Sequence, residues 1–230
     1  MPTLVVTGAN RGIGLALTEH YLNEGWELIA TCRQPDTATA LAALHDSARE
    51  RCTVLPLDVT EPTSVSRLAA RLAGRPLDLL INNAGVSGNN AGALGRYRYQ
   101  AWQETFATNC LGAVRVSEAL LDNLRRGAGK TLVAITSQLG SIANSGGGFE
   151  AYAVSKAALN MAMRDLAANL RGDGIKVLML HPGWVKTDMG GASAPVSAAQ
   201  SAAGIARVVA TSSLSDSGRF LDYRGNELPW

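Results

Sequence analysis

The chain has 230 residues, of which 47% are hydrophobic and 17% charged, and its formal net charge is +2. This composition is typical of a globular protein and excludes disordered and fibrous classes. The charge excess is weak, and no basic run is longer than the pair Arg125 and Arg126. The sequence therefore predicts neither a nucleic-acid-binding surface nor an acidic-membrane-binding surface.

The cysteines Cys32, Cys52 and Cys110 are widely separated and show no CxxC or His/Cys spacing. Neither a disulfide framework nor a metal site is predicted, and a reducing compartment is the simpler interpretation. The opening MPTLVVTGAN lacks the charged and apolar regions of a signal peptide. Because no apolar run approaches the roughly 20 residues of a membrane span, we expect a cytoplasmic protein without a membrane partner.

Short apolar runs rich in β-branched residues alternate along the chain with segments of helical period. Strands are predicted at residues 3–7, 26–32, 52–59, 77–85, 129–137 and 175–183, with a short one at 218–223. Helices are predicted at residues 12–25, 37–50, 61–74, 100–126, 151–172 and 197–211. Such alternation is typical of an α/β fold with a doubly wound parallel sheet between two helical layers. Without a linker or compositional break, residues 1–230 are interpreted as one Rossmann-type domain.

The first predicted strand ends in TGANRGIG, residues 7–14. Glycine between a strand and a helix lets the backbone turn sharply and approach a pyrophosphate, toward which the helix N-terminus then directs its N–H groups. A tight turn without a ligand is the alternative interpretation. The order of strand, loop and helix favours dinucleotide binding.

The Gly-x3-Gly-x-Gly spacing of this loop resembles that of the short-chain dehydrogenase/reductase family. Further motifs follow in the order of that family: NNAG at 82–85, Asn109, Ser137, Tyr-x3-Lys at 152–156 and Pro-Gly at 182–183. The resemblance runs from Thr3 to about Met189. TSQLGSI, YAVSKAALN and RGNELPW are similar to the carbonyl-reductase-like branch that includes the C-factor and sniffer proteins.

The cofactor preference is predicted from the end of the second strand, where LIATCRQPD places no carboxylate that would bind ribose hydroxyls. Arg33 follows this strand and Arg11 lies in the glycine loop, so two guanidinium groups are available to a 2′-phosphate. This favours NADP(H), with NAD(H) as the second choice. Two solvated surface arginines are the alternative interpretation.

The resemblance also implies a set of cofactor contacts. Asp58 and Val59 would border the adenine ring, Asn83 to Gly85 the ribose side, and Thr187 the nicotinamide amide. Asp58 as a helix cap and residues 83–85 as a strand-end turn are the alternatives. The full set is Gly8, Asn10, Arg11, Gly12, Ile13, Gly14, Arg33, Asp58, Val59, Asn83, Ala84, Gly85, Tyr152, Lys156, Pro182, Gly183, Val185 and Thr187.

Tyr152 and Lys156 are one helical turn apart, so they share a face. Reduction of a carbonyl leaves an alkoxide that needs a proton, and a neighbouring ammonium favours the phenolate form of a tyrosine. A helix-surface pair without function is the alternative. The resemblance implies that Tyr152 is the acid, that Lys156 also binds the nicotinamide ribose, that Ser137 orients the substrate oxygen and that Asn109 holds a water. Ser141 and Ser145 lie in the same loop as Ser137.

A short substrate loop is expected near residues 184–196, where Trp184 and Met189 are candidates for lining a pocket. Core packing explains Trp184 equally well. The glycine-rich segment 86–99 is either a second wall or exposed surface. Apolar residues lie on more than one face of the helices predicted at 100–126 and 151–172, which indicates a homodimer or homotetramer; coverage by loops is the alternative.

The sequence thus predicts an NADP(H)-dependent oxidoreductase acting on a small carbonyl or secondary alcohol. A dinucleotide-binding signalling protein of the C-factor type is the alternative, against which the presence of Ser137, Tyr152 and Lys156 counts. A redox-neutral epimerase or dehydratase is disfavoured by the glycine spacing.

Overall fold

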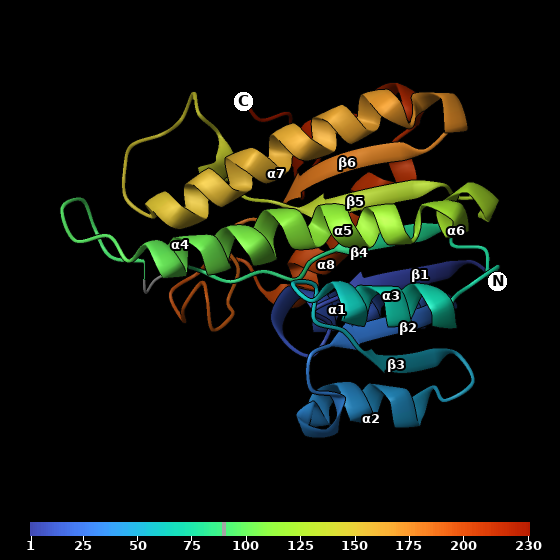
Figure 1. The fold of residues 1–230 in the computed structure, drawn as a ribbon. Coiled ribbons are helices and arrows are strands. Elements are labelled where there is room, and N and C mark those ends of the chain that lie inside the picture. The colour runs from blue at the N-terminus through green and yellow to red at the C-terminus, as the bar shows by residue number, and fades with distance from the viewer. Residues whose placement is uncertain (89–90) are drawn as a thin grey trace.

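A parallel seven-stranded sheet runs through the residues that the computed structural model describes, 1–88 and 91–230 (Figure 1). Its strand order is β3-β2-β1-β4-β5-β6-β7, which is the doubly wound arrangement predicted from the sequence. Because all seven strands belong to one sheet, we interpret residues 1–230 as one domain. The strands are β1 (Thr3–Thr7), β2 (Glu27–Cys32), β3 (Cys52–Pro56), β4 (Leu79–Asn82), β5 (Thr131–Ile135), β6 (Lys176–His181) and β7 (Phe220–Asp222).

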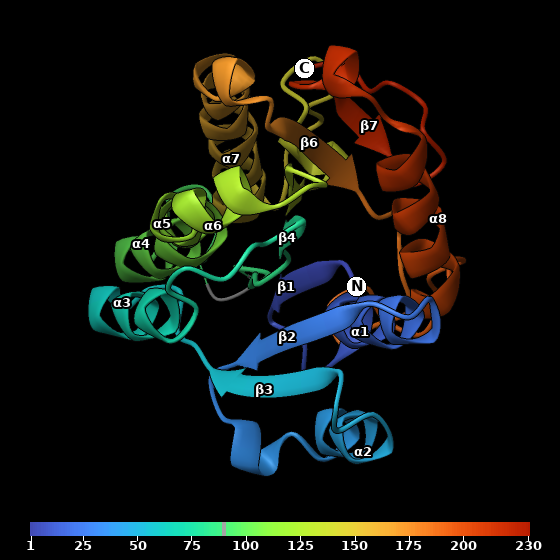
Figure 2. The same ribbon diagram turned by 90° about the vertical axis from the view of Figure 1, so that its right-hand side faces the viewer.

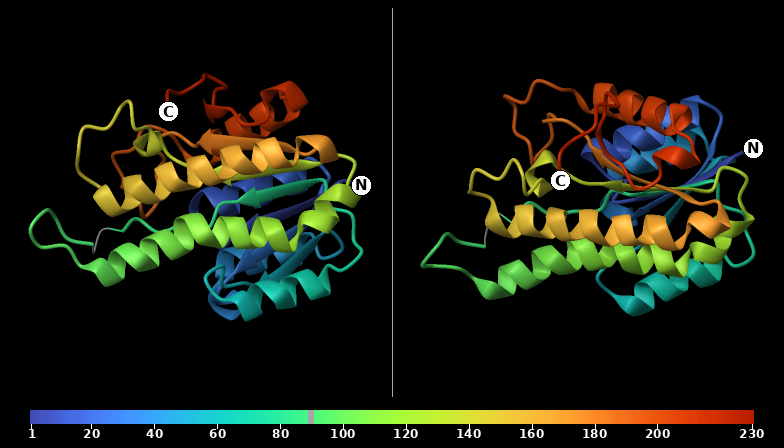
Figure 3. Two further views of the ribbon diagram at one scale, coloured as in Figure 1. Left: turned by 45° about the horizontal axis from the view of Figure 1, so that its top comes forward. Right: turned by 90° about the horizontal axis from the view of Figure 1, so that it is seen from above.

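Helices cover both faces of the sheet (Figures 2 and 3). One face packs against α1 (Gly12–Asn23), α2 (Thr39–Ser47) and α8 (Ala198–Thr211). The other packs against α3 (Pro62–Arg71), α5 (Gly112–Ala119), α6 (Leu121–Arg126) and α7 (Glu150–Asn169), and α4 (Tyr99–Phe106) lies beside α7. Short 3₁₀ turns span Pro35–Thr37, Gln138–Gly140, Arg171–Asp173 and Leu214–Asp216.

Apolar side chains of each strand alternate between the two helical layers. In β1, Leu4 and Val6 pack toward α1 and α8, whereas Val5 packs toward α5 and α7. All three are fully buried. A strand covered on both faces is apolar at most positions, which explains the near-continuous apolar runs in the sequence.

The predicted helix over residues 100–126 is not continuous. A π-helical turn at Ala107–Leu111 separates α4 from α5, and Leu120 separates α5 from α6. The predicted strands at 52–59, 77–85, 129–137 and 175–183 are also longer than β3 to β6, because the residues that follow these strands leave the sheet. Residues 89 and 90 of the predicted loop 86–99 lie outside the described residues.

All three cysteines, Cys32, Cys52 and Cys110, are buried and unpaired. Within the described residues, no helix has the length and hydrophobicity that a membrane span requires.

Candidate active site

The order in which strands are added to the sheet reverses at β1. The chain first places β2 and β3 on one side of β1 and then crosses to place β4 on the other side. At the carboxyl ends of the strands lies a cleft of about 1870 Å³. This is the position at which open parallel sheets bind ligands. The cleft exceeds the roughly 300–1,000 Å³ of a drug-sized site.

The glycine loop between β1 and α1 forms one wall of this cleft. Gly8 and Gly12 have φ values of 66° and 55°, a left-handed conformation that favours glycine. A Cβ atom on Gly8 would come within 2.9 Å of Ala84 Cα, and one on Gly12 within 3.1 Å of Thr187 Cγ2. The loop therefore leaves its backbone open to a ligand and packs against both neighbouring segments.

Gly14 lies behind the loop and is not among the residues that line the cleft. A Cβ atom there would lie 2.2 Å from the oxygen of Gly8 and 2.5 Å from Asn83 Nδ2. The Asn83 amide itself donates to the carbonyl oxygens of Thr7 and Gly8 at 2.9 and 3.0 Å. Gly14 thus allows the close packing that shapes the loop, rather than touching a ligand as the sequence analysis expected.

The other residues expected to bind the cofactor all line the cleft: Gly8, Asn10, Arg11, Gly12, Ile13, Arg33, Asp58, Val59, Asn83, Ala84, Gly85, Tyr152, Lys156, Pro182, Gly183, Val185 and Thr187. Asp58 is also part of a local turn, because its Oδ1 accepts from the backbone N–H and the hydroxyl of Thr60. Both interpretations of Asp58 are therefore compatible with its position.

The two arginines expected to read a 2′-phosphate differ in their contacts. Arg11 pairs with Asp188 of the 184–196 segment, with 2.5 Å between Nη1 and Oδ2. Arg33 is exposed and lines a recess with Gln34 and Asp58. Arg33 is thus better placed than Arg11 to meet a phosphate in this recess.

Ser137 and Tyr152 both line the wall of the cleft, and the Ser137 hydroxyl lies close enough to the Tyr152 hydroxyl to affect its pKa. Ser137 follows β5 and accepts from the N–H of Leu139 at 3.1 Å. Burial raises the pKa of Tyr152, and the neighbouring Ser137 hydroxyl opposes this shift. Burial opposes the shift toward the phenolate that the sequence predicted from Lys156, and that shift stays a prediction.

The other serines of this loop lie elsewhere. Ser141 is buried away from the cleft and donates to the carbonyl of Trp230, whereas Ser145 is exposed. Neither is among the residues that line the cleft. The geometry therefore singles out Ser137.

Lys156 is 4% exposed, and its Nζ donates to the carbonyl oxygen of Ile135 at 2.8 Å. Nζ also lies 5.7 Å from the centroid of the Tyr152 ring. Burial lowers the pKa of this ammonium from 10.5 to about 8. Lys156 is thus a buried cation near the Tyr152 ring, not a surface residue.

Asn109 lies within the π-helical turn and does not itself line the cleft, but its Oδ1 lies close to Gly85 of the cleft wall. Its Oδ1 accepts from the N–H of Val86 at 2.8 Å, and its Nδ2 donates to the Val86 carbonyl at 2.9 Å and to Ser155 Oγ at 3.0 Å. π-helical turns often occur at functional sites. This one directs the Asn109 amide onto the segment after β4 and onto α7, so its side chain fixes the walls of the cleft.

Apolar side chains line the end of the cleft near Tyr152, namely Leu139, Phe149, Trp184 and Met189. Trp184 is 54% exposed, and its Nε1 donates to the Gly190 carbonyl at 2.8 Å. Core packing is therefore the wrong interpretation of Trp184. The segment that carries it is closed by pairing of Val185 with Val196.

Among the cleft residues that sequence reasoning did not single out, Phe149 and His181 are the most unusual. Phe149 has φ 56°, a strained conformation for a residue with a side chain. His181 is buried at the end of β6; burial lowers its pKa to about 4, and its Nδ1 has no hydrogen-bond partner among the described residues. Only the three glycines before Phe149 hint at an unusual turn, and no pattern marks His181. No group of metal-binding side chains occurs in the described part of the chain.

Comparison with known proteins places these observations in context. The family model for short chain dehydrogenase matches residues 2–196. The C-signal protein of Myxococcus xanthus is 48% identical over 163 residues, which cover 70% of this chain and 98% of that protein.

Two solved structures are similar over the whole chain. The carbonyl reductase Sniffer of D. melanogaster has a TM-score of 0.94 at 32% identity, and the match covers 100% of both chains. NADPH-bound carbonyl reductase from chicken fatty liver has a TM-score of 0.92 at 34% identity, covering 100% of this chain and 99% of that one.

Proposed function

Because the chain belongs to the short-chain dehydrogenase/reductase family, we propose that it is an NADP(H)-dependent oxidoreductase acting on a carbonyl or secondary-alcohol substrate. When bound, the nicotinamide supplies or accepts the hydride. The cleft fits a dinucleotide, because the loop with Gly8 and Gly12 keeps side chains out of its wall. The N-terminus of α1 follows this loop, where a pyrophosphate is favoured.

Tyr152 is the proton donor in this proposal. Burial keeps its pKa above the ordinary value, so the hydroxyl holds its proton at neutral pH and is available to an alkoxide. Ser137, which lines the cleft next to Tyr152, positions the substrate oxygen beside that proton. In the alcohol-oxidising direction Tyr152 would instead have to accept a proton, which burial disfavours.

In this proposal Lys156 supplies positive charge near the Tyr152 ring and binds the nicotinamide ribose. Its anchor on the Ile135 carbonyl fixes α7 to the end of β5, where Ser137 follows. Asn109 is a positioning residue, since its amide is occupied by Val86 and Ser155. The water that the sequence analysis assigned to Asn109 stays a prediction.

The preference for NADP(H) is supported by Arg33 in its recess beside Asp58 and by the absence of a carboxylate at the end of β2. The carbonyl reductase of chicken fatty liver, similar over the whole chain, was solved with NADPH. Arg11 contributes less, because Asp188 already neutralises it.

One observation carries the proposal: Ser137, Tyr152 and Lys156 come together at the end of the cleft that the glycine loop opens. The test mixes the purified protein with NADPH or NADH and a panel of aliphatic, aromatic and dicarbonyl compounds, and follows absorbance of the reduced nicotinamide. Oxidation of NADPH that depends on a carbonyl compound is expected. Absence of turnover across the panel would overturn the enzymatic proposal.

The similarity to C-signal favours a second candidate, a dinucleotide-binding signalling protein. In that case, calorimetry would detect tight NADPH binding without turnover on any carbonyl. A complete set of Ser137, Tyr152 and Lys156 makes this the weaker candidate.

Self-association is part of the proposal. The helix formed by α4 and the π-helical turn lies beside α7 (Figure 3). Four apolar residues are exposed on these elements: Phe106, Leu111, Val154 and Met161. By contrast, Val116, Leu120 and Met163 belong to the core, so the apolar stripe is narrower than the sequence suggested. We propose a homodimer or homotetramer through this face, in the cytoplasm.

A further inference from the structure

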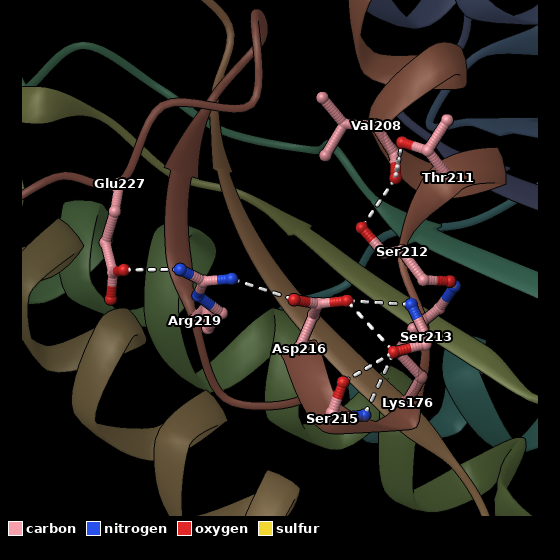
Figure 4. Close-up of polar contacts among 9 residues, drawn as sticks. All are labelled: Lys176, Val208, Thr211, Ser212, Ser213, Ser215, Asp216, Arg219 and Glu227. Atoms are coloured by element: carbon pink, nitrogen blue, oxygen red, sulfur yellow. Dashed lines mark hydrogen bonds and ion pairs between the residues drawn. The ribbon is translucent and has the colours of Figure 1, made fainter.

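Residues 223–230 turn back along β7. Asp222 accepts at Oδ1 from the N–H groups of Arg224 and Asn226, which reverses the chain, and Leu228 then donates to the carbonyl of Phe220 at 2.9 Å. Arg219 pairs with Glu227 at 2.6 Å and with Asp216 at 2.8 Å (Figure 4). The returning segment, residues 226–230, is therefore fixed by backbone and ionic contacts.

Trp230 is held in place at its ring. The centroid of the Trp230 ring lies 5.6 Å from that of Phe220, which is fully buried. The guanidinium of Arg164, a residue of α7, lies 5.5 Å from the centroid of the Trp230 ring. Arg164 is itself fixed, because its Nη1 donates to the Gly218 carbonyl at 2.6 Å. Aromatic and cation contacts of this kind orient the indole and hence its backbone.

The backbone of Trp230 meets the loop that follows Ser137. Its carbonyl oxygen accepts from the N–H of Ala143 at 2.7 Å and from Ser141 Oγ at 3.3 Å. Ser141 is 2% exposed, so the contact is protected from water. Residues 137–144, here called the serine loop, are thus attached to the returning segment.

The opposite side of the serine loop packs against α7. A Cβ atom on Gly140 would lie 2.9 Å from the carbonyl carbon of Lys156, and Asn160 Nδ2 donates to the Gly140 oxygen at 3.4 Å. Within the loop, Gly140 N–H donates to the Ser137 carbonyl at 2.9 Å. The loop is therefore held between the helix that carries Tyr152 and the carbonyl of Trp230.

We propose that Trp230 is a positioning residue, which presses the serine loop against α7 and so holds Ser137 beside Tyr152 at the wall of the cleft. This inference rests on the proposed function, because it concerns the same serine and tyrosine. Trp230 does not line the cleft, so it acts through the loop and not on a substrate. Misplacing a reacting group slows catalysis without weakening the binding of a cofactor held elsewhere.

The test compares Trp230→Ala and Trp230→Phe with a matched control, Trp26→Ala. Trp26 lies just before β2, at the amino ends of the strands and so opposite the cleft. Its ring packs on that of Tyr21. Hydrogen exchange measured by mass spectrometry reports on residues 137–144. In Trp230→Ala we expect these amides to exchange about tenfold faster or more, with little change in β1 or α1.

Kinetics provide the second readout. For Trp230→Ala we expect kcat to fall about tenfold, with the Kd of NADPH unchanged within about twofold, and for Trp230→Phe a value near wild type. Trp26→Ala should lower the melting temperature but alter neither loop exchange nor kcat. If Trp230→Ala does not fold, Glu227→Gln, which removes the ion pair to Arg219, should give the same pattern in weaker form.

Unchanged exchange in the serine loop of the Trp230→Ala or Glu227→Gln protein overturns the inference. So does an equal loss of kcat in Trp26→Ala, since Trp230 would then act only through general stability. A wild-type protein with no turnover on any carbonyl overturns the proposed function instead, and the exchange experiment still decides whether Trp230 holds the loop.

Discussion

Lys156 Nζ donates to the carbonyl oxygen of Ile135 at 2.8 Å, so the ammonium is anchored to the end of β5 while it lies beside the ring of Tyr152. The bond joins two segments that the chain separates by 21 residues. It brings the lysine of α7 next to the strand after which Ser137 follows. A buried cation of this kind has consequences for both stability and catalysis.

The first consequence is a pH-dependent stability. Burial lowers the pKa of Lys156 from 10.5 to about 8, so between these values the unfolded chain holds a proton that the folded chain has lost. The contribution of Lys156 to the free energy of unfolding therefore rises with pH over this window, by roughly 3 kcal/mol in all. Below pH 8 both states hold the proton, and the full cost of burying the ammonium destabilises the folded state. Lys156→Met removes this titration. Urea unfolding from pH 7.5 to 10.5 should show wild type gaining on the variant, and a constant difference would contradict the prediction.

Tyr152→Phe removes the hydroxyl and keeps the ring. If Tyr152 is the proton donor, turnover should fall by about 10²- to 10⁴-fold. Binding of NADPH should stay within about twofold of wild type, because the ring still fills its place in the cleft wall. Steady-state rates and calorimetry measure the two quantities. Turnover that survives in the phenylalanine variant would falsify the assigned role.

Ser137→Ala should lower kcat about a hundredfold, because the group that orients the substrate oxygen is lost. Ser145→Ala is the matched control, since Ser145 directly follows the serine loop and is exposed outside the cleft. Its rates should equal those of wild type. Equal activity of the two variants would show that the wrong serine has been chosen.

Arg33→Ala should weaken NADPH binding by about 10- to 100-fold, which is the loss expected for one or two charge-assisted hydrogen bonds. The affinity for NADH should change little. Arg11→Ala should have a smaller effect, because Arg11 pairs with Asp188. Arg171→Ala, at the exposed turn after α7, controls for the loss of one charge. An unchanged preference for NADPH in Arg33→Ala would remove the basis of the cofactor assignment.

Gly14→Ala should lower the free energy of unfolding by about 1–3 kcal/mol, because the added methyl group would collide with the Gly8 carbonyl and the Asn83 amide. NADPH binding should weaken as well, since the glycine loop must shift. Gly172→Ala serves as the control, as a Cβ atom there would meet no neighbour within 4 Å. Denaturant unfolding of both proteins checks the prediction, and similar stabilities would argue against tight packing at Gly14.

The sequence predicted the sheet well, because strands buried on both faces are apolar at most positions and the helices between them are amphipathic. It was wrong about the continuous helix over 100–126. No proline interrupts that segment, and the π-helical turn coincides with a tertiary contact, the double hydrogen bond of Asn109 to Val86. The helical period of residues 100–126 cannot predict that Asn109 bonds to Val86, which lies 23 residues away.

The candidate site was predictable to a similar extent. Motif order identified the residues that line the cleft, whereas their partners depend on packing. The Arg11 ion pair joins residues 177 positions apart, and the Trp230 carbonyl meets Ser141 across 89 positions. The left-handed conformation of Phe149 likewise contradicts the preference of a bulky residue. Such long-range and strained features lie beyond periodicity and spacing.

The strand order also bears on how the sheet is assembled and held. β1 pairs with β2 across 24 residues but with β4 across about 75 residues, so the seam between β1 and β4 carries the greatest loop-closure entropy of the neighbouring pairs. The cleft lies over this seam, between the segments that follow the two strands. A dinucleotide bound there would contact both sides of the seam, and at a hundred times its Kd would stabilise the folded state by about 2.7 kcal/mol. Cofactor supply would then influence how much folded protein a cell retains as well as how fast it works.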